Sequence, residues 1–145
     1  MPTRYVICLL LALAAAPRLA KAEPAKPSGS SSILPSSSRL EELWNGGEFT
    51  EGVAVAADGS VYFSDIPSGA GTTGQVHRFD PRTGKTTVHC AASGKSNGLM
   101  FDRAGRLIAC CGANNGRMAL CEILPGGKLK VLTERFNGGR YLSPN

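Results

Sequence analysis

Residues 51–66 have the sequence EGVAVAADGSVYFSDI, and residues 97–112 have the sequence NGLMFDRAGRLIACCG. Each stretch contains two short apolar runs separated by a turn with a glycine, which is typical of a β-hairpin. The two stretches align without a gap at an offset of 46 residues, so that Gly59 matches Gly105. A hairpin that recurs at a fixed offset predicts a fold built from a repeated β unit.

Each repeat extends beyond this hairpin. In the first repeat, Asp58-Gly59 favours a tight type I′ turn, and a second turn is expected at residues 80–84, where Asp, Pro and Gly come together. The strands expected around these turns are residues 53–56, 61–65, 75–79 and 85–90. Four strands that follow one another through short connections predict an antiparallel meander.

The second repeat continues in the same way. Residues 117–134 mirror residues 74–91, with Gly126-Gly127 at the turn, and no helical periodicity is sustained after the N-terminal region. A four-stranded unit that recurs at roughly 40 to 50 residues is the signature of a β-propeller blade. We therefore expect an all-β chain with about two blades. A β-sandwich is the alternative, but the fixed offset between turn glycines favours the propeller.

The N-terminus has the features of an export signal. Residues 1–4 carry one positive charge, an apolar run follows at residues 5–16, and Ala20-Lys21-Ala22 presents the small residues that a signal peptidase accepts. The apolar run is shorter than the roughly 20 residues needed to span a membrane. We expect cleavage after Ala22, a secreted or periplasmic protein and no stable membrane span, with an uncleaved anchor as the alternative.

The remaining chain divides by composition. Residues 23–38 are dominated by Ser and Pro and are expected to form a disordered spacer. Residues 39–145 are the expected folded part, which is enough for a modest core but not for a large enclosed active site. Removal of residues 1–22 takes away three basic residues and no acidic one, leaving a net charge near +2. Because the basic residues are scattered and do not interleave with aromatic residues, we expect no nucleic-acid partner.

The cysteines leave two roles open. Cys8 lies in the predicted signal peptide, so Cys90, Cys110, Cys111 and Cys121 would remain. They could form disulfides, with three pairings available, or serve as small buried apolar residues. Zinc is not favoured, because no C-x-x-C pair is present and neighbours in a strand point to opposite faces.

Three stretches together resemble the senescence marker protein / gluconolactonase / regucalcin-like family: FTEGVAVAADGSVYFSDIPSG (49–69), SGKSNGLMFDRAGRLIAC (93–110) and RFNGGRYLSPN (135–145). Members of this family are six-bladed, calcium-dependent propellers of the phosphotriesterase/gluconolactonase type that hydrolyse sugar lactones. The resemblance covers almost all of residues 44–145. It implies that residues 39–145 hold blades 1 and 2 and the start of blade 3, so the chain is expected to be an N-terminal fragment.

The resemblance also implies the residues of a site. Glu51 matches the metal-binding glutamate of an E-G-P-x-W motif, although Val53 and Val55 stand in place of the Pro and the Trp. Asn145 matches the asparagine of an S-P-N-D motif, which lies over the same metal as a ligand or substrate contact. Asn97, which like Glu51 is expected just before a channel-lining strand, is given only a lining role.

The rest of the implied site falls in later blades. Two further metal ligands and the acidic general base match no residue of this sequence, so no catalytic residue is assigned within the chain. The implied cofactor is a divalent cation, foremost Ca²⁺, with Zn²⁺, Mg²⁺ and Mn²⁺ as alternatives. Calcium takes six to eight oxygen ligands, so Glu51 alone cannot hold it.

Other polar residues are given structural roles. Asp65 is expected to hold a neighbouring loop, and Asp102 to cap a turn through its own backbone. His77 and His89 are expected at the surface or an edge, since neither has a Ser or Cys partner at the spacing of a catalytic triad. Residues 68–74 (SGAGTTG) lead into a strand rather than a helix, so a flexible connection is expected there and not a phosphate site.

Two functions follow as hypotheses. The first is an exported hydrolase of small sugar lactones that uses metal-assisted hydrolysis, with little activity from these 145 residues alone. The second is a non-catalytic exported propeller piece that acts as a binding or assembly module and self-associates through open blade edges.

Overall fold

The structure, a computed structural model, describes residue 28 and residues 32–145. The chain divides into a first unit that ends at Glu41 and a second unit, Glu42–Asn145. The described part of the first unit has one backbone turn, closed by a hydrogen bond from Ser38 N to Pro35 O (2.9 Å). The predicted signal peptide lies outside the described residues, as does half of the predicted spacer. Within the described residues, no helix is long and apolar enough to cross a membrane.

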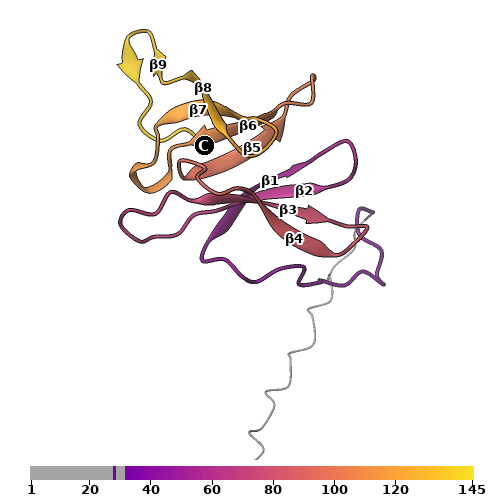
Figure 1. Cartoon of the computed structure of the whole chain (residues 1–145). Helices are drawn as coiled ribbons and strands as arrows, with labels where there is room; N and C mark the ends of the chain where they lie inside the picture. Colours follow the sequence, from indigo (N-terminus) through magenta and orange to yellow (C-terminus); the bar gives the residue numbers. More distant parts are fainter. Residues whose placement is uncertain (1–27, 29–31) are drawn as a thin grey trace, which may run out of the picture. The chain divides into compact units, whose positions relative to one another are not determined.

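The second unit begins with a four-stranded antiparallel sheet in which each strand pairs with the next (Figure 1). Its strands are β1 (Thr50–Val55), β2 (Val61–Asp65), β3 (Gln75–Asp80) and β4 (Lys85–Cys90). The predicted strands at 61–65 and 85–90 agree with the structure, and the third is longer by Asp80 alone. The first strand starts three residues earlier than predicted, at Thr50, and this difference places Glu51 inside the sheet.

A second sheet repeats the first. Its strands are β5 (Ser96–Phe101), β6 (Leu107–Cys111), β7 (Ala119–Ile123) and β8 (Leu129–Thr133), again in sequential antiparallel order (Figure 1). A 3₁₀ turn, η1 (Ala113–Asn115), joins β6 to β7, and a small hairpin of β9 (Arg135–Phe136) and β10 (Gly139–Arg140) follows. The described residues therefore form an all-β structure of two blade-like meanders that do not close into a ring.

The turn predicted at Asp58-Gly59 is wrong in type. A type I′ turn needs a positive φ at both central residues, but among these two only Gly59 has one (φ 84°). The loop is longer, because Gly59 N donates to Ala56 O (2.9 Å) and Ala56 N donates to Ser60 O (2.9 Å). Asp58 instead accepts a hydrogen bond from Ser60 N on its carboxylate (2.9 Å), which is the local backbone bond that favours Asp in turns.

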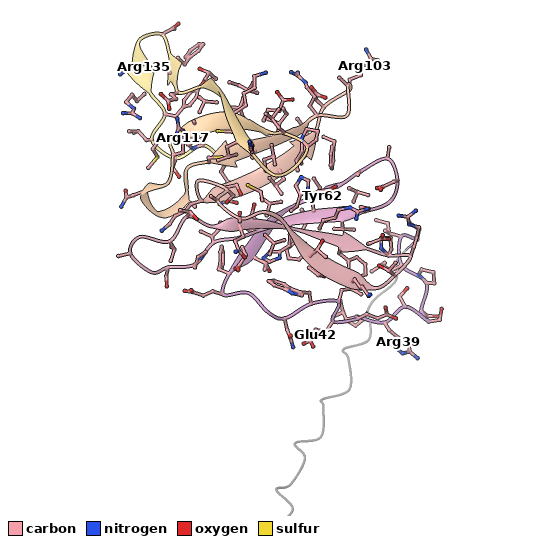
Figure 2. The ribbon with its side chains drawn as sticks, in the orientation of Figure 1. Arg39, Glu42, Tyr62, Arg103, Arg117 and Arg135 are labelled. Atoms are coloured by element: carbon pink, nitrogen blue, oxygen red, sulfur yellow. The ribbon has the colours of Figure 1, made fainter. Side chains whose placement is uncertain are left out.

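An apolar core lies between the two sheets, since β1 and β2 both contact β5. It consists of small and branched side chains from both sheets: Ala54, Val76, Cys90, Leu99, Leu107, Ala109, Cys111, Ala119, Cys121 and Ile123. Tyr62, which Figure 2 labels near the junction of the sheets, packs edge-on against Phe101 with ring centroids 5.3 Å apart. The small residues let the sheets approach closely, as close-packed protein interiors require.

The cysteines belong to this core. Cys90, Cys111 and Cys121 are buried, Cys110 is half-buried, and all four are free thiols. Burial raises the pKa of the Cys90 thiol, and a hydrogen bond with Cys121, together with burial, raises the pKa of Cys111. Of the two roles predicted for the cysteines, the structure therefore shows small apolar core residues and not disulfides.

Candidate functional site

Glu51 is the second residue of β1, not a residue before the strand as predicted. It is half-buried and lies opposite Ser64 of β2, and a bulge follows it between Glu51 and Ala54. Residues directly opposite in an antiparallel pair share a face, so Glu51 lies on the face from which Ser64 reaches the second sheet. A bulge next to this position turns the strand locally, as bulges near functional sites often do.

Gly52 brings β1 against β5. Its φ is +62°, and a β-carbon added to it would lie only 1.7 Å from the carbonyl oxygen of Asn97. The same carbonyl accepts a hydrogen bond from the Ser64 hydroxyl (3.0 Å), and the hydroxyls of Ser64 and Ser96 lie 2.9 Å apart. The two strands therefore meet through backbone at the position next to Glu51.

Asn97 is the second residue of β5, and it too lies inside the strand rather than before it. Its side-chain oxygen Oδ1 is buried and has no hydrogen-bond partner among the described residues. Buried polar atoms are almost always paired, so an unpaired acceptor in a native fold needs an explanation. An amide oxygen in this state is available to a cation or to a hydroxyl donor.

Asn145 comes to the same neighbourhood from the C-terminal segment. A β-carbon on Gly98 would lie 3.0 Å from the carbonyl carbon of Asn145, and one on Gly112 would lie 2.4 Å from Cδ of Pro144. Gly98 follows Asn97 directly in β5. The contact of Gly98 with Asn145 thus repeats, one blade later, the contact of Gly52 with Asn97, and the structure brings the three predicted site residues to one end of β1 and β5.

The oxygen donors at this end suit calcium in kind but not in number. Glu51 supplies one carboxylate, and Asn97 and Asn145 supply amide oxygens. Among the described residues, no group of three or more His, Cys, Asp or Glu side chains could hold a metal ion. Since calcium takes six to eight oxygens, these residues do not make a complete metal site.

Asp65 and Asp102 have the structural roles predicted for them. Asp65 Oδ1 accepts hydrogen bonds from the backbone N–H groups of Glu48 (3.0 Å) and Phe49 (3.1 Å), and so holds the segment that leads into β1. Asp102 Oδ1 accepts from the N–H groups of Ala104 and Arg106, both at 2.9 Å, across the β5–β6 turn. Asp65 therefore positions the strand that carries Glu51.

The prediction that His77 lies at the surface or an edge is wrong. Its exposure is 5%, because the ring packs against both Trp44 (centroids 4.4 Å apart) and Phe63 (5.4 Å) on the first sheet. The segment before β1 covers this face with Trp44, which strand alternation could not predict. His89 does lie on an outer strand, β4, half-buried and edge-on to Tyr62 (5.0 Å).

The burial of His77 predicts a pH dependence of stability. Burial lowers the pKa of His77, and the nearby Asp65 charge opposes this only in part. Between the lowered folded value and the unfolded value of about 6.5 the unfolded chain binds more protons. The contribution of His77 to the free energy of unfolding is therefore fully present above about pH 6.5, and it is lost as the pH falls.

We expect the free energy of unfolding in urea to decrease between pH 7.5 and pH 5.5, and to decrease less in a His77→Phe variant. Some dependence should remain in the variant, because burial lowers the pKa of His89 as well. Hydrogen bonds from backbone N–H groups lower the pKa values of carboxyls such as Asp58 and Asp102, which moves their titration further away from this window. An equal decrease in both proteins would contradict the assignment to His77.

Lys95, which the sequence did not single out, lies beside this end of the sheets. It has an exposure of 8% and lines two cavities together with the β2–β3 loop and η1. The connection between β2 and β3 was predicted to be flexible. In the structure it has hydrogen bonds: Thr72 Oγ1 donates to Gly69 O (2.7 Å), and Ser68 N donates to Glu48 Oε1 (3.0 Å). In the sequence, only the position of Lys95 two residues before Asn97 could have drawn attention to it.

Two solved structures are similar to this chain. A gluconolactonase from Xanthomonas campestris matches it with a TM-score of 0.61 and 27% sequence identity, over 71% of this chain and 32% of that chain. A protein provisionally assigned as a gluconolactonase matches it with a TM-score of 0.59 and 27% identity, over 72% of this chain and 34% of that chain. No family model and no curated protein matches the sequence.

The chain spans about a third of the length of each of these two structures. Both have a propeller-type fold; the first is a gluconolactonase and the second is provisionally assigned as one. The predicted resemblance to the gluconolactonase family and the predicted propeller type of fold are therefore confirmed.

Proposed function

We propose that this gluconolactonase-like chain supplies the first part of a site that hydrolyses a sugar lactone. The observation that carries the proposal is the match of 71% of this chain to the Xanthomonas gluconolactonase. The match covers only about a third of that enzyme, so lactone hydrolysis by a protein that contains this chain is itself proposed. The export signal expected at residues 1–22 supports a secreted or periplasmic location.

Within this proposal, Glu51 is the metal ligand and Asn145 orients the metal or the substrate. The position of Glu51 beside the Gly52–Asn97 contact supports this role, because a rigid backbone junction fixes the strand that carries the carboxylate. Asn97 lines the same end, and its unpaired Oδ1 could accept a hydrogen bond from a sugar hydroxyl. A divalent cation held at this end would polarise the lactone carbonyl, and a carboxylate that is not among these residues would activate water for hydrolysis.

The proposal is tested with a chimera in which residues 42–145 replace the matching third of the Xanthomonas gluconolactonase. Titration of the released acid at constant pH measures hydrolysis of D-glucono-1,5-lactone. We expect calcium-dependent hydrolysis by the chimera, slower than by the parent enzyme because 27% identity leaves many contacts between the two parts unmatched. A chimera that unfolds cooperatively and yet does not hydrolyse the lactone would contradict the proposal.

The 145-residue chain alone is expected to show no lactone hydrolysis above the buffer rate. Its described residues provide too few metal-binding groups, and no carboxylate with the role of the general base is assigned within it. The measurement is the same acid titration, with and without added calcium. Calcium-dependent hydrolysis by the isolated chain would show that these residues already complete a site.

A second function, as an assembly module, is supported by the open sheets. Apolar side chains are exposed on both blades, among them Val55 (61%) on β1 and Met100 (64%) on β5, and unpaired strand edges favour association. We expect the chain to self-associate, with a mass above that of a monomer in light scattering and a fraction that grows with concentration. A monodisperse monomer that unfolds cooperatively would exclude the need for assembly.

A further inference from the structure

The junction of the two sheets contains a pair of buried serine hydroxyls for which the proposed function has no role. Ser64 of β2 and Ser96 of β5 are both fully buried, and their hydroxyl oxygens lie 2.9 Å apart. Ser64 Oγ also donates a hydrogen bond to the backbone carbonyl of Asn97 (3.0 Å). The core beside them consists of small and branched apolar side chains, so hydroxyls buried there need an explanation. We call Ser64 and Ser96 the serine pair.

The hydrogen bonds of the serine pair have one direction. A serine hydroxyl has a single hydrogen to donate and two lone pairs that accept. Because Ser64 donates its hydrogen to Asn97 O, Ser96 is the donor within the pair. Ser96 is held in turn by its own backbone, since its N–H donates to the hydroxyl oxygen of Ser93 (3.2 Å), which is also fully buried. Hydrogen bonds in sequence strengthen one another, and this sequence ends on Asn97.

The pair acts where the strands with the predicted site residues meet. Ser64 lies opposite Glu51 in the pairing of β1 with β2, and the Asn97 carbonyl that it binds is the one against which Gly52 packs. The side-chain Oδ1 of Asn97 is buried and has no hydrogen-bond partner among the described residues. No hydrogen bond to Oδ1 therefore fixes this amide, and its position depends on how the backbone of Asn97 is held.

We propose that Ser64 and Ser96 are positioning residues, which hold Asn97 so that its free Oδ1 accepts a hydrogen bond from a hydroxyl group of the substrate. The inference rests on the proposed function for the identity of that substrate. The serine pair acts through Asn97 and touches no reacting atom. It therefore sets the preference of the site for a hydroxylated lactone over an unsubstituted one, and not the rate of the chemical step.

The first test measures this preference in the chimera with residues 42–145. The two substrates are D-glucono-1,5-lactone and δ-valerolactone, which has the same ring without hydroxyl groups. Ser64→Ala should raise KM for the gluconolactone about three- to tenfold, the worth of one neutral hydrogen bond, and leave kcat and both constants for δ-valerolactone nearly unchanged. Ser64→Thr keeps the hydroxyl and should restore the preference. An equal loss with both lactones would contradict a positioning role.

Two further variants separate positioning from a general loss of packing. Ser60, just before β2 and at the opposite end from Ser64, is also buried, and its hydroxyl accepts a hydrogen bond from Arg78 (2.6 Å). Ser60→Ala should lower the melting temperature as Ser64→Ala does, but leave the preference between the lactones unchanged. Asn97→Ala should lose the preference, and Ser64→Ala added to it should lose no more, because the serine acts through the asparagine. Independent losses that multiply would overturn the inference.

NMR spectra of the full chain test the arrangement without any substrate. The hydroxyl protons of Ser64 and Ser96 should be visible, because buried, hydrogen-bonded protons exchange slowly with water. This measurement also covers the case in which Ser64→Ala does not fold. In the folded Ser64→Ala chain the signals of the Asn97 side-chain amide and the Gly98 N–H should shift, and in Ser60→Ala they should not. Missing hydroxyl signals, or Asn97 signals that do not move, would overturn the inference.

The two kinds of measurement distinguish failure of this inference from failure of the proposed function. A chimera that hydrolyses the gluconolactone with the same preference in its Ser64→Ala form removes the positioning role and leaves the proposed function. A folded chimera without hydrolysis, together with shifted Asn97 signals in the Ser64→Ala chain, removes the proposed function and leaves Asn97 positioned by the serine pair.

Discussion

Replacement of Gly52 by alanine is expected to unfold the protein or to leave it without packing between its sheets. The added β-carbon would lie 1.7 Å from the Asn97 carbonyl oxygen, and the backbone φ of +62° is unfavourable for alanine. The left-handed conformation costs about 1–2 kcal/mol, and the backbone shift that relieves the overlap costs about 1–3 kcal/mol more. The two costs together, about 2–5 kcal/mol, approach the lower end of the stability of a small domain, about 5–15 kcal/mol.

The matched control is Gly84→Ala. Gly84 has nearly the same conformation (φ +66°), but a β-carbon there would meet nothing within 4 Å. It should therefore lose only the conformational cost, about 1–2 kcal/mol. Urea unfolding followed by circular dichroism gives both values. Similar losses in the two variants would show that β1 and β5 do not meet at Gly52 and Asn97.

The order of the strands could be predicted from the sequence because the signals for it are local and repeat along the chain. Turn residues and alternating strands depend on neighbours in the chain, so strands such as β2 and β4 were predicted to the residue. The offset of 46 residues carried this prediction to the second sheet. The structure adds that Gly52 and Gly98 are glycines because a backbone crosses each of them.

Other features depend on packing between distant segments and were not predictable in this way. The alternation of polar and apolar residues around His77 is also that of an exposed position in a strand. His77 is buried because Trp44, in the segment before β1, packs on it. Lys95 looks like an ordinary solvated lysine until the β2–β3 loop and η1 surround it. The type of the Asp58 turn also differed, because Asp58 bonds its own backbone through Ser60 N. For His77 and Lys95 a contact from outside the local pattern decided the outcome, whereas the Asp58 bond is local and only its turn type was predicted wrongly.

The Glu51→Gln exchange has the second large expected effect. Glutamine keeps the size of the side chain and its place opposite Ser64 in β1, but it removes the negative charge that a hard divalent cation favours. In a lactonase site this should lower kcat/KM by roughly 100-fold or more, since the loss of even outer-shell support for a metal costs 10–100-fold. Stability should change little, because Glu51 is only half-buried.

The most direct test of the account is calcium-dependent hydrolysis of D-glucono-1,5-lactone by the chimera that carries residues 42–145, compared with its Glu51→Gln form. Glu42→Gln, outside the strands and exposed, is the matched control. We predict that the chimera and the Glu42→Gln form hydrolyse the lactone at similar rates, and that the Glu51→Gln form loses activity by roughly 100-fold or more. If the folded Glu51→Gln chimera keeps its kcat/KM within about twofold, Glu51 is not a metal ligand and the central claim is contradicted.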